Sequence, residues 1–271
     1  MTGSGIVVDR HHRPAWLRLV AHQVRYDMRV VLRDPQSRFL TILLPVIFLI
    51  LFASLFGAHA THVNGHLITN VTYYVPGICT LGVIATSLVN LVITLTAQRE
   101  SGILKRRRST PAPAWVLIAS RTVTSAILAV ALVSVLAAIG HIAYGVRIPA
   151  ATLPAFAVGV VLGSFVFCCL AFAITSFISN EDSAQPMIQA IVLPLYFVSG
   201  VFVPERQLSH ALQDIASVFP VAHLNNALFE AFDPGTTGVG IAGKDLTILA
   251  LWGVGGLVVA LWRFSWSPKS N

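Results

Sequence analysis

Residues 39–98 read FLTILLPVIFLILFASLFGAHATHVNGHLITNVTYYVPGICTLGVIATSLVNLVITLTAQ, and no Asp, Glu, Lys or Arg interrupts them. A helix of about 20 apolar residues crosses the core of a bilayer, so this stretch has room for two spans and a turn. Four more stretches lack charged side chains, at 122–146, 148–180, 183–204 and 246–262. The pattern predicts an all-α, polytopic membrane protein.

Six transmembrane helices fit into these stretches. We expect a cytoplasmic N-terminal segment at 1–38, a six-helix transmembrane domain at 39–262 and a cytoplasmic tail at 263–271. The chain is 55% hydrophobic and 11% charged, which leaves no room for a large soluble domain, and residues 1–38 hold no apolar segment typical of a signal peptide. The expected spans are about 39–57, 73–97, 116–142, 154–178, 187–203 and 246–262.

Basic residues set the expected orientation, because cytoplasmic loops carry an excess of Lys and Arg. Most of them fall before the first span or between the second and third spans: Arg10, Arg13, Arg18, Arg25, Arg29, Arg33, Arg38, Arg99, Lys105, Arg106, Arg107 and Arg108. Both chain ends are therefore expected on the cytoplasmic side. The membrane is expected to be the plasma (cell inner) membrane. The net charge of +7 then lies on the cytoplasmic face, where it can meet anionic lipid or a protein partner. We do not expect nucleic-acid binding, because the basic residues do not belong to a folded soluble domain.

The N-terminal segment contains a second helical pattern. Apolar residues from Trp16 to Leu32 recur at helical spacing with arginines between them, which predicts an amphipathic helix in the membrane interface. Pro35 is expected to end this helix and let the chain turn into the first span. Further on, Arg121 lies just inside the third span, where we expect its side chain to reach back to the cytoplasmic surface.

The loop between the second and third spans, residues 98–111, reads QRESGILKRRRSTP. A positive-inside bias explains its basic residues, but it does not explain the early Glu and Gly, the apolar pair or the final Thr-Pro. The segment resembles the same loop in permease subunits of type-2 ABC transporters, the daunorubicin-exporter-like family that exports drugs, lipids and polysaccharides. The departures are Ile103 and Arg107. The matching residues are Arg99, Glu100, Gly102, Leu104, Lys105, Arg106, Arg108, Thr110 and Pro111.

Other segments resemble this family in the same order along the chain. Residues 199–205, SGVFVPE, are similar to the end of its fifth span, and residues 219–228, FPVAHLNNAL, to the segment that follows. The sequence Arg33-Asp34-Pro35 and Pro45 in the first span also fit. The resemblance covers about 16–262.

The resemblance implies a permease that exports an amphiphilic substrate, a drug-like compound or a lipid, as in drug efflux and antibiotic resistance. Two copies of a separate cytoplasmic P-loop ATPase would bind ATP and Mg, and a second, identical or related permease would complete the path. This chain would carry no cofactor and no enzymatic activity, since none of its lysines completes GxxxxGK[ST]. The loop would form a coupling helix that contacts the ATPase through Arg99, Glu100, Gly102, Leu104, Lys105, Arg106, Arg107 and Arg108.

Residues 204–244, between the last two spans, contain two short apolar patterns separated by Pro220. We interpret them as a re-entrant helical hairpin that includes Ser199, Gly200, Pro204 and Pro220, as the resemblance also implies. An ordinary surface loop is the alternative. Gly159 and Gly163 in the fourth span, and Gly253, Gly255 and Gly256 in the sixth, allow close helix packing either within the chain or between two permeases.

Two other function classes remain to be weighed. An ion-coupled secondary transporter usually has carboxylates at the middle of the membrane, and none lies inside the six expected spans. An intramembrane serine protease would need Ser199 and His141 as nucleophile and base. His59, His62 and His66 have the spacing of metal ligands on a helix, but no carboxylate lies nearby, so we predict no metal site.

Overall fold

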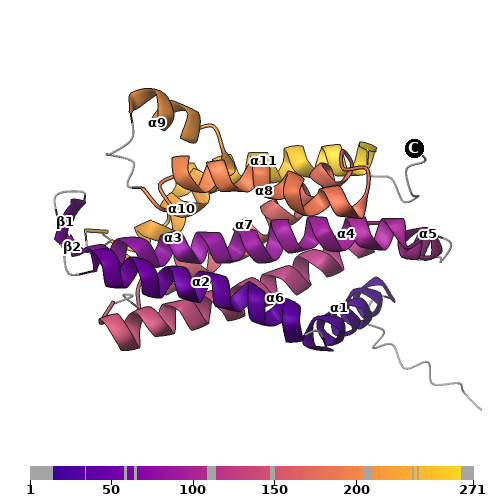
Figure 1. The fold of residues 1–271 in the computed structure, drawn as a ribbon, viewed down its shortest axis with the longest axis horizontal. Coiled ribbons are helices and arrows are strands. Elements are labelled where there is room, and N and C mark those ends of the chain that lie inside the picture. Colours follow the sequence, from indigo (N-terminus) through magenta and orange to yellow (C-terminus); the bar gives the residue numbers. More distant parts are fainter. Residues whose placement is uncertain are drawn as a thin grey trace, which may run out of the picture.

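The computed structural model describes residues 15–33, 35–57, 60–63, 66–108, 114–146, 150–203, 209–233, 235–236 and 238–263. In this part the chain is helical, as predicted, except for one short β-hairpin (Figure 1). The elements are α1 (Ala15–Arg33), α2 (Pro35–Phe56), β1 (Ala60–Val63), β2 (His66–Thr69), α3 (Asn70–Ile84), the π-helical η1 (Ala85–Val89), α4 (Asn90–Glu100), α5 (Ile103–Arg108), α6 (Ala114–Tyr144), α7 (Leu153–Thr175), α8 (Glu181–Val198), α9 (His210–Ala216), α10 (Pro220–Glu230) and α11 (Gly243–Arg263).

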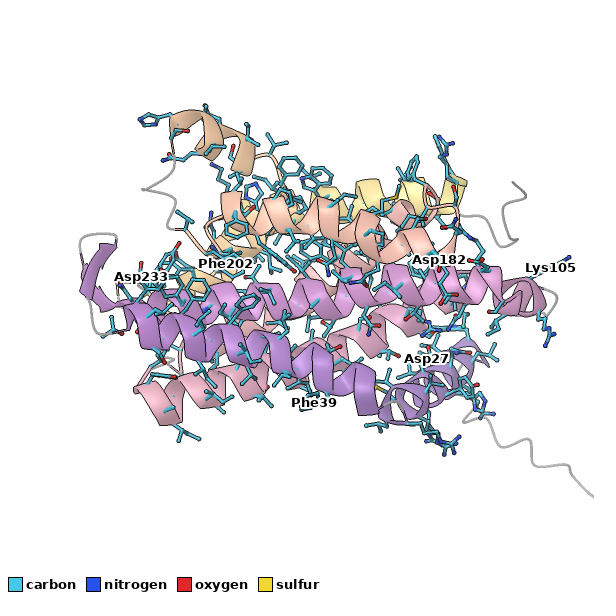
Figure 2. The ribbon with its side chains drawn as sticks, viewed as in Figure 1. Asp27, Phe39, Lys105, Asp182, Phe202 and Asp233 are labelled. Carbon is cyan, nitrogen blue, oxygen red and sulfur yellow. The ribbon has the colours of Figure 1, made fainter. Side chains whose placement is uncertain are left out.

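The long helices run side by side, so the bundle has two ends (Figure 1). One end holds α1, α5 and the turn between α7 and α8, and we call it the α5 end. The other holds β1, β2 and α9, and we call it the hairpin end. Figure 2 shows Asp27, Lys105 and Asp182 at the α5 end and Asp233 at the hairpin end. Helix α1 and the basic loop therefore share one end, as the charge pattern predicts.

Four helical segments of the described chain are long and apolar enough to cross a membrane: Asn70–Glu100, Trp115–Tyr144, Leu153–Thr175 and Gly243–Arg263. The first of these runs through α3, η1 and α4 without a break. They correspond to the expected second, third, fourth and sixth spans. The apolar part of α2, Thr41–Phe56, is shorter, and α8 is not among the four, so the count of six spans stays a prediction.

Helix α8 differs from the expected fifth span at both ends. It begins at Glu181, before the apolar run, because the side chain of Asn180 accepts a hydrogen bond from the N–H of Ser183 and caps the helix. It ends at Val198, where the chain enters a turn and Gly200 has a φ of 76°. A polar capping residue, which hydropathy alone does not weigh, therefore sets the start of this helix.

The glycines of α7 and α11 pack within this chain. A Cβ on Gly163 would lie 2.7 Å from the side chain of Leu224, and one on Gly159 would lie 2.9 Å from Leu228, so both glycines seat α10 against α7. Gly253 and Gly256 of α11 in turn face α7. Of the two interpretations left open by sequence, these four glycines serve packing inside the chain.

Two of the three histidines, His62 and His66, lie in strands and not on a helix. His62 lies in β1 and His66 in β2, two antiparallel strands in which His62 pairs with Leu67 and His66 with Val63. His59 lies outside the described residues, as do residues 1–14 and the tail after Arg263. Within the described part, no three His, Cys, Asp or Glu side chains form a group that could hold a metal ion.

Candidate functional site at the α5 end

The basic loop begins with a glycine turn. Helix α4 ends at Glu100, and Gly102 follows with a φ of 74°, a left-handed conformation that glycine adopts without strain. This turn redirects the chain into α5. On α5, Leu104 is completely buried in the hydrophobic core, whereas Ile103, Lys105 and Arg106 are exposed. The turn therefore produces a short helix with one face packed and a basic face open.

Arg99, the residue before the end of α4, points into the protein. It is 1% exposed, and its guanidinium donates hydrogen bonds to the carbonyl of Thr175, the last residue of α7, and to two carbonyls of the turn that follows. Nη1 lies 2.9 Å from the oxygen of Thr175, and Nη2 lies 2.6 Å from that of Ile178 and 3.2 Å from that of Ser179. A cation is favourable there because carbonyls at the C-terminal end of a helix lack partners and carry partial negative charge.

Glu100 binds the opposite pole of the same turn. Its Oε2 accepts a hydrogen bond of 2.6 Å from the backbone N–H of Glu181, the first residue of α8. N–H groups in the first turn of a helix lack internal partners and carry partial positive charge, so a carboxylate is stabilised there. Two successive residues of α4 thus hold the end of α7 and the start of α8.

Arg121 forms the centre of a second polar cluster. Its Nε lies 3.6 Å from Oδ2 of Asp27 on α1, and its Nη2 donates to Oε1 of Gln98 on α4 at 3.0 Å. Gln23 donates to the other oxygen of Asp27 at 2.8 Å. Arg121 is therefore buried in a network between α1, α4 and α6, and the prediction that it extends to the surface is wrong. Its burial follows from a carboxylate on α1 that neutralises it.

The predicted coupling residues divide into two groups. Glu100, Lys105 and Arg106 have exposed side chains, whereas Arg99 and Leu104 are buried inside the chain. The hydrogen bonds of Arg99 run to the end of α7 and to the turn after it, so its guanidinium is not available to a partner protein. Gly102 supplies the turn, and the side chains of Arg107 and Arg108 lie outside the described part.

Sequence reasoning missed Gln23, Asp27 and Gln98. One signal was present: Asp27 is the only acidic residue described in α1, and it lies four residues after Gln23 on the face that also carries Val20, Val24 and Val31. A carboxylate on an apolar helix face indicates a buried partner. The identity of that partner, Arg121, required the packing of α1 against α6.

At the hairpin end, α10 starts at Pro220 and is almost entirely buried among α3, α7 and α11. The preceding Ser199 and Gly200 are also buried, and the carbonyl of Gly200 accepts a hydrogen bond of 2.7 Å from the hydroxyl of Tyr73. Pro204 lies outside the described residues. The imidazole of His141 forms a hydrogen bond with the carbonyl of Val146, 2.9 Å away. Within the part of the chain that the structure describes, no hydrogen bond joins His141 to Ser199, so a serine–histidine pair gains no support.

An aromatic cluster joins the helices near the hairpin end. The ring of Phe202, after α8, stacks on Phe52 of α2 with centroids 5.3 Å apart and lies 5.5 Å from Phe48. Phe52 in turn lies 4.9 Å from Tyr74 of α3. Figure 2 shows Phe202 in the half of the bundle nearer the hairpin end. The expected first, second and fifth spans therefore contact one another through aromatic rings.

Comparison with known proteins identifies the family. No curated protein matches the chain. Residues 18–232 match the family described as ABC-2 type transporter, a region that runs from α1 to the end of α10 and so contains both polar clusters. The match spans well over half of the chain, and the apolar helices fit a protein that spans a membrane more than once. The protein belongs to the ABC-2 type transporter family and is the permease component of an ABC transporter.

Proposed function

We propose that this permease exports an amphiphilic substrate, a drug-like compound or a lipid, with energy from ATP that a separate ATPase subunit hydrolyses. The observation that carries the proposal is the exposed basic face of α5, Lys105 and Arg106, on a helix whose other face is anchored by Leu104. Such a helix offers a charged docking surface and transmits force to the bundle. A daunorubicin-exporter-like role in drug efflux and antibiotic resistance fits this proposal.

The proposed assembly has two ATPase copies and two permeases, identical or related. ATP and Mg would be bound by the ATPase, and this chain would have no ATP site and no enzymatic activity of its own. The permease would lie in the plasma (cell inner) membrane with six spans and both chain ends in the cytoplasm. The sharing of one bundle end by α1 and α5 supports this orientation (Figure 1).

The proposed export path runs between two permeases along α2, α3 and α8. The aromatic rings of Phe48, Phe52 and Phe202 support a path for amphiphilic molecules, because aromatic faces bind apolar groups and cations alike. At the outer end, α9 and α10 would form the re-entrant hairpin. The burial of α10 between α3, α7 and α11 supports this, since backbone at membrane depth must be enclosed by protein.

The test is purification of the tagged permease from its native membrane in mild detergent. We expect a P-loop ATPase to accompany the wild type, and much less of it to accompany the charge-reversed variant Lys105→Glu/Arg106→Glu. Lys244→Glu is the matched control, because Lys244 is an exposed lysine at the hairpin end. Recovery of the wild type without an ATPase, where a known ABC complex survives, together with transport that depends on a proton gradient and not on ATP, would favour a secondary transporter.

A further inference from the structure

The dipeptide Arg99-Glu100 matches the charges of two helix ends that meet in one turn. The carbonyl end of α7 faces the guanidinium, and the amide end of α8 faces the carboxylate. Each contact therefore joins a formal charge to the helix dipole of opposite sign, an arrangement that also shortens and strengthens the hydrogen bonds. Exchanging the two residues would place each charge against a like pole.

The position of α8 depends on these hydrogen bonds and on packing against α4. Helix α8 packs along α4 and η1, rather than along α7, which precedes it in the chain. The start of α8 is therefore located by its contacts with α4 and by the hydrogen bond from Glu181 to Glu100. The turn itself, residues 176–180, is held by Arg99 through the carbonyls of Ile178 and Ser179. Glu100 and Gly102 lie only two residues apart, so the same chain segment leads directly into α5.

We propose that Arg99 and Glu100 are positioning residues that make the α7–α8 turn move with the start of α5 as one body. When the partner ATPase displaces α5, Arg99 pulls the end of α7 and Glu100 pulls the start of α8. Helix α8, which packs against α4, then moves with it. The inference rests on the proposed function for the source of the movement. The hydrogen bonds of Arg99 and Glu100 to the α7–α8 turn, which we call the clamp, are formed within this chain alone.

The backbone of Glu181 allows the clamp to be broken without touching the basic loop. Glu181 is the first residue of α8, a position that favours proline because its N–H has no partner within the helix. The preceding Asn180 is already extended, with a φ of −137° and a ψ of 169°, as a residue before proline requires. Glu181→Pro therefore deletes the hydrogen bond to Glu100 and keeps the helix. Glu181→Gln removes the same charge but retains the N–H, and is the matched control.

The experiment uses the full complex in lipid vesicles, with spin labels on cysteines introduced by Ser101→Cys and Gln185→Cys, both at exposed positions. The native Cys79, Cys168 and Cys169 are completely buried and serve as an unlabelled background. Distances between the labels are measured without nucleotide and after trapping with ATP and vanadate. ATP hydrolysis and export of a fluorescent amphiphile are measured on the same samples.

We expect one narrow distance distribution in the wild type and in Glu181→Gln, unchanged by trapping. In Glu181→Pro the distribution should broaden or shift on trapping. Hydrolysis should continue, while substrate exported per ATP falls about tenfold, the size of effect expected when a charge-assisted hydrogen bond is lost. Simple misfolding would instead reduce recovery of the complex and hydrolysis together.

Three outcomes would overturn the inference. One is a wild-type complex that hydrolyses ATP but changes the distance between positions 101 and 185. Another is a Glu181→Pro variant that exports as efficiently as Glu181→Gln. The third, a wild-type protein with no associated ATPase, would overturn the proposed function and this inference with it, and is recognised because hydrolysis is then absent from every sample.

Discussion

Asp27 of α1 and Arg121 of α6 form a buried ion pair across the α5 end, with side chains that are only 1% and 10% exposed. Removing one partner of such a pair leaves the other charge buried without compensation, which costs far more than the pair contributes. The ion pair thus makes the attachment of α1 to the bundle depend on two particular residues.

We expect Asp27→Asn to destabilise the protein by about 3–5 kcal/mol, because the charge of Arg121 stays buried. Thermal unfolding in detergent measures this. Arg29→Ala, an exposed arginine on the same helix, should have little effect. Combining Asp27→Asn with Arg121→Gln should cost clearly less than the sum of the two single changes, and simple additivity would argue against the pair.

A substitution at Gly163 tests the packing of α10 against α7. A side chain there meets Leu224 within 2.7 Å, so Gly163→Val should push α10 away and cost about 1–3 kcal/mol, as overpacking of a core does. Gly255→Val is the matched control, since no atom lies within 4 Å of a Cβ at that helical position. Leu224→Ala should restore part of the loss in thermal stability, and a lack of any rescue would contradict the proposed contact.

The turn before α5 depends on a left-handed residue. Gly102→Ala has open space around the new Cβ, so its cost of about 1–2 kcal/mol comes from backbone conformation alone. Asn adopts this conformation more readily, and Gly102→Asn should retain more stability and more export activity than Gly102→Ala. Equal behaviour of the two variants in thermal unfolding and transport would show that the left-handed turn is not required.

His223 joins three segments at the hairpin end. Its Nδ1 lies 2.6 Å from Oδ1 of Asp245, and its Nε2 lies 2.8 Å from the carbonyl of Ser217. His223→Leu leaves both acceptors without a hydrogen-bond donor. We therefore expect the free energy of unfolding to fall by about 1–3 kcal/mol for each acceptor left unsatisfied. His210→Leu, an exposed histidine of α9, is the control, and a similar fall in melting temperature for both variants would contradict the prediction.

The orientation can be tested with a membrane-impermeant maleimide on intact cells. A cysteine introduced by His210→Cys, at the hairpin end, should react from outside, whereas one introduced by Ser101→Cys should react only after permeabilisation. The native cysteines are buried and should stay unlabelled. Labelling of position 101 in intact cells would reverse the proposed topology.

The amino-acid sequence by itself determined the helices, the break at Pro35 and the basic character of one loop. These follow from local properties: long stretches without charge can satisfy their backbone groups as helices in a membrane, and a proline favours extended backbone in the residue before it. The family resemblance rested on the same local motifs, and the match of residues 18–232 bears out its broad form.

Only the tertiary structure decided what the polar residues do. Arg99 lies in a basic loop and reads as a surface residue, yet its partners are carbonyls 76 to 80 positions further along the chain. The same holds for Asp27 with Arg121, and for the glycines of α7 that seat α10. A side chain's charge or size is visible in sequence, but the partner that compensates a buried charge or fills a glycine's space comes from a distant segment, and packing alone brings the two together.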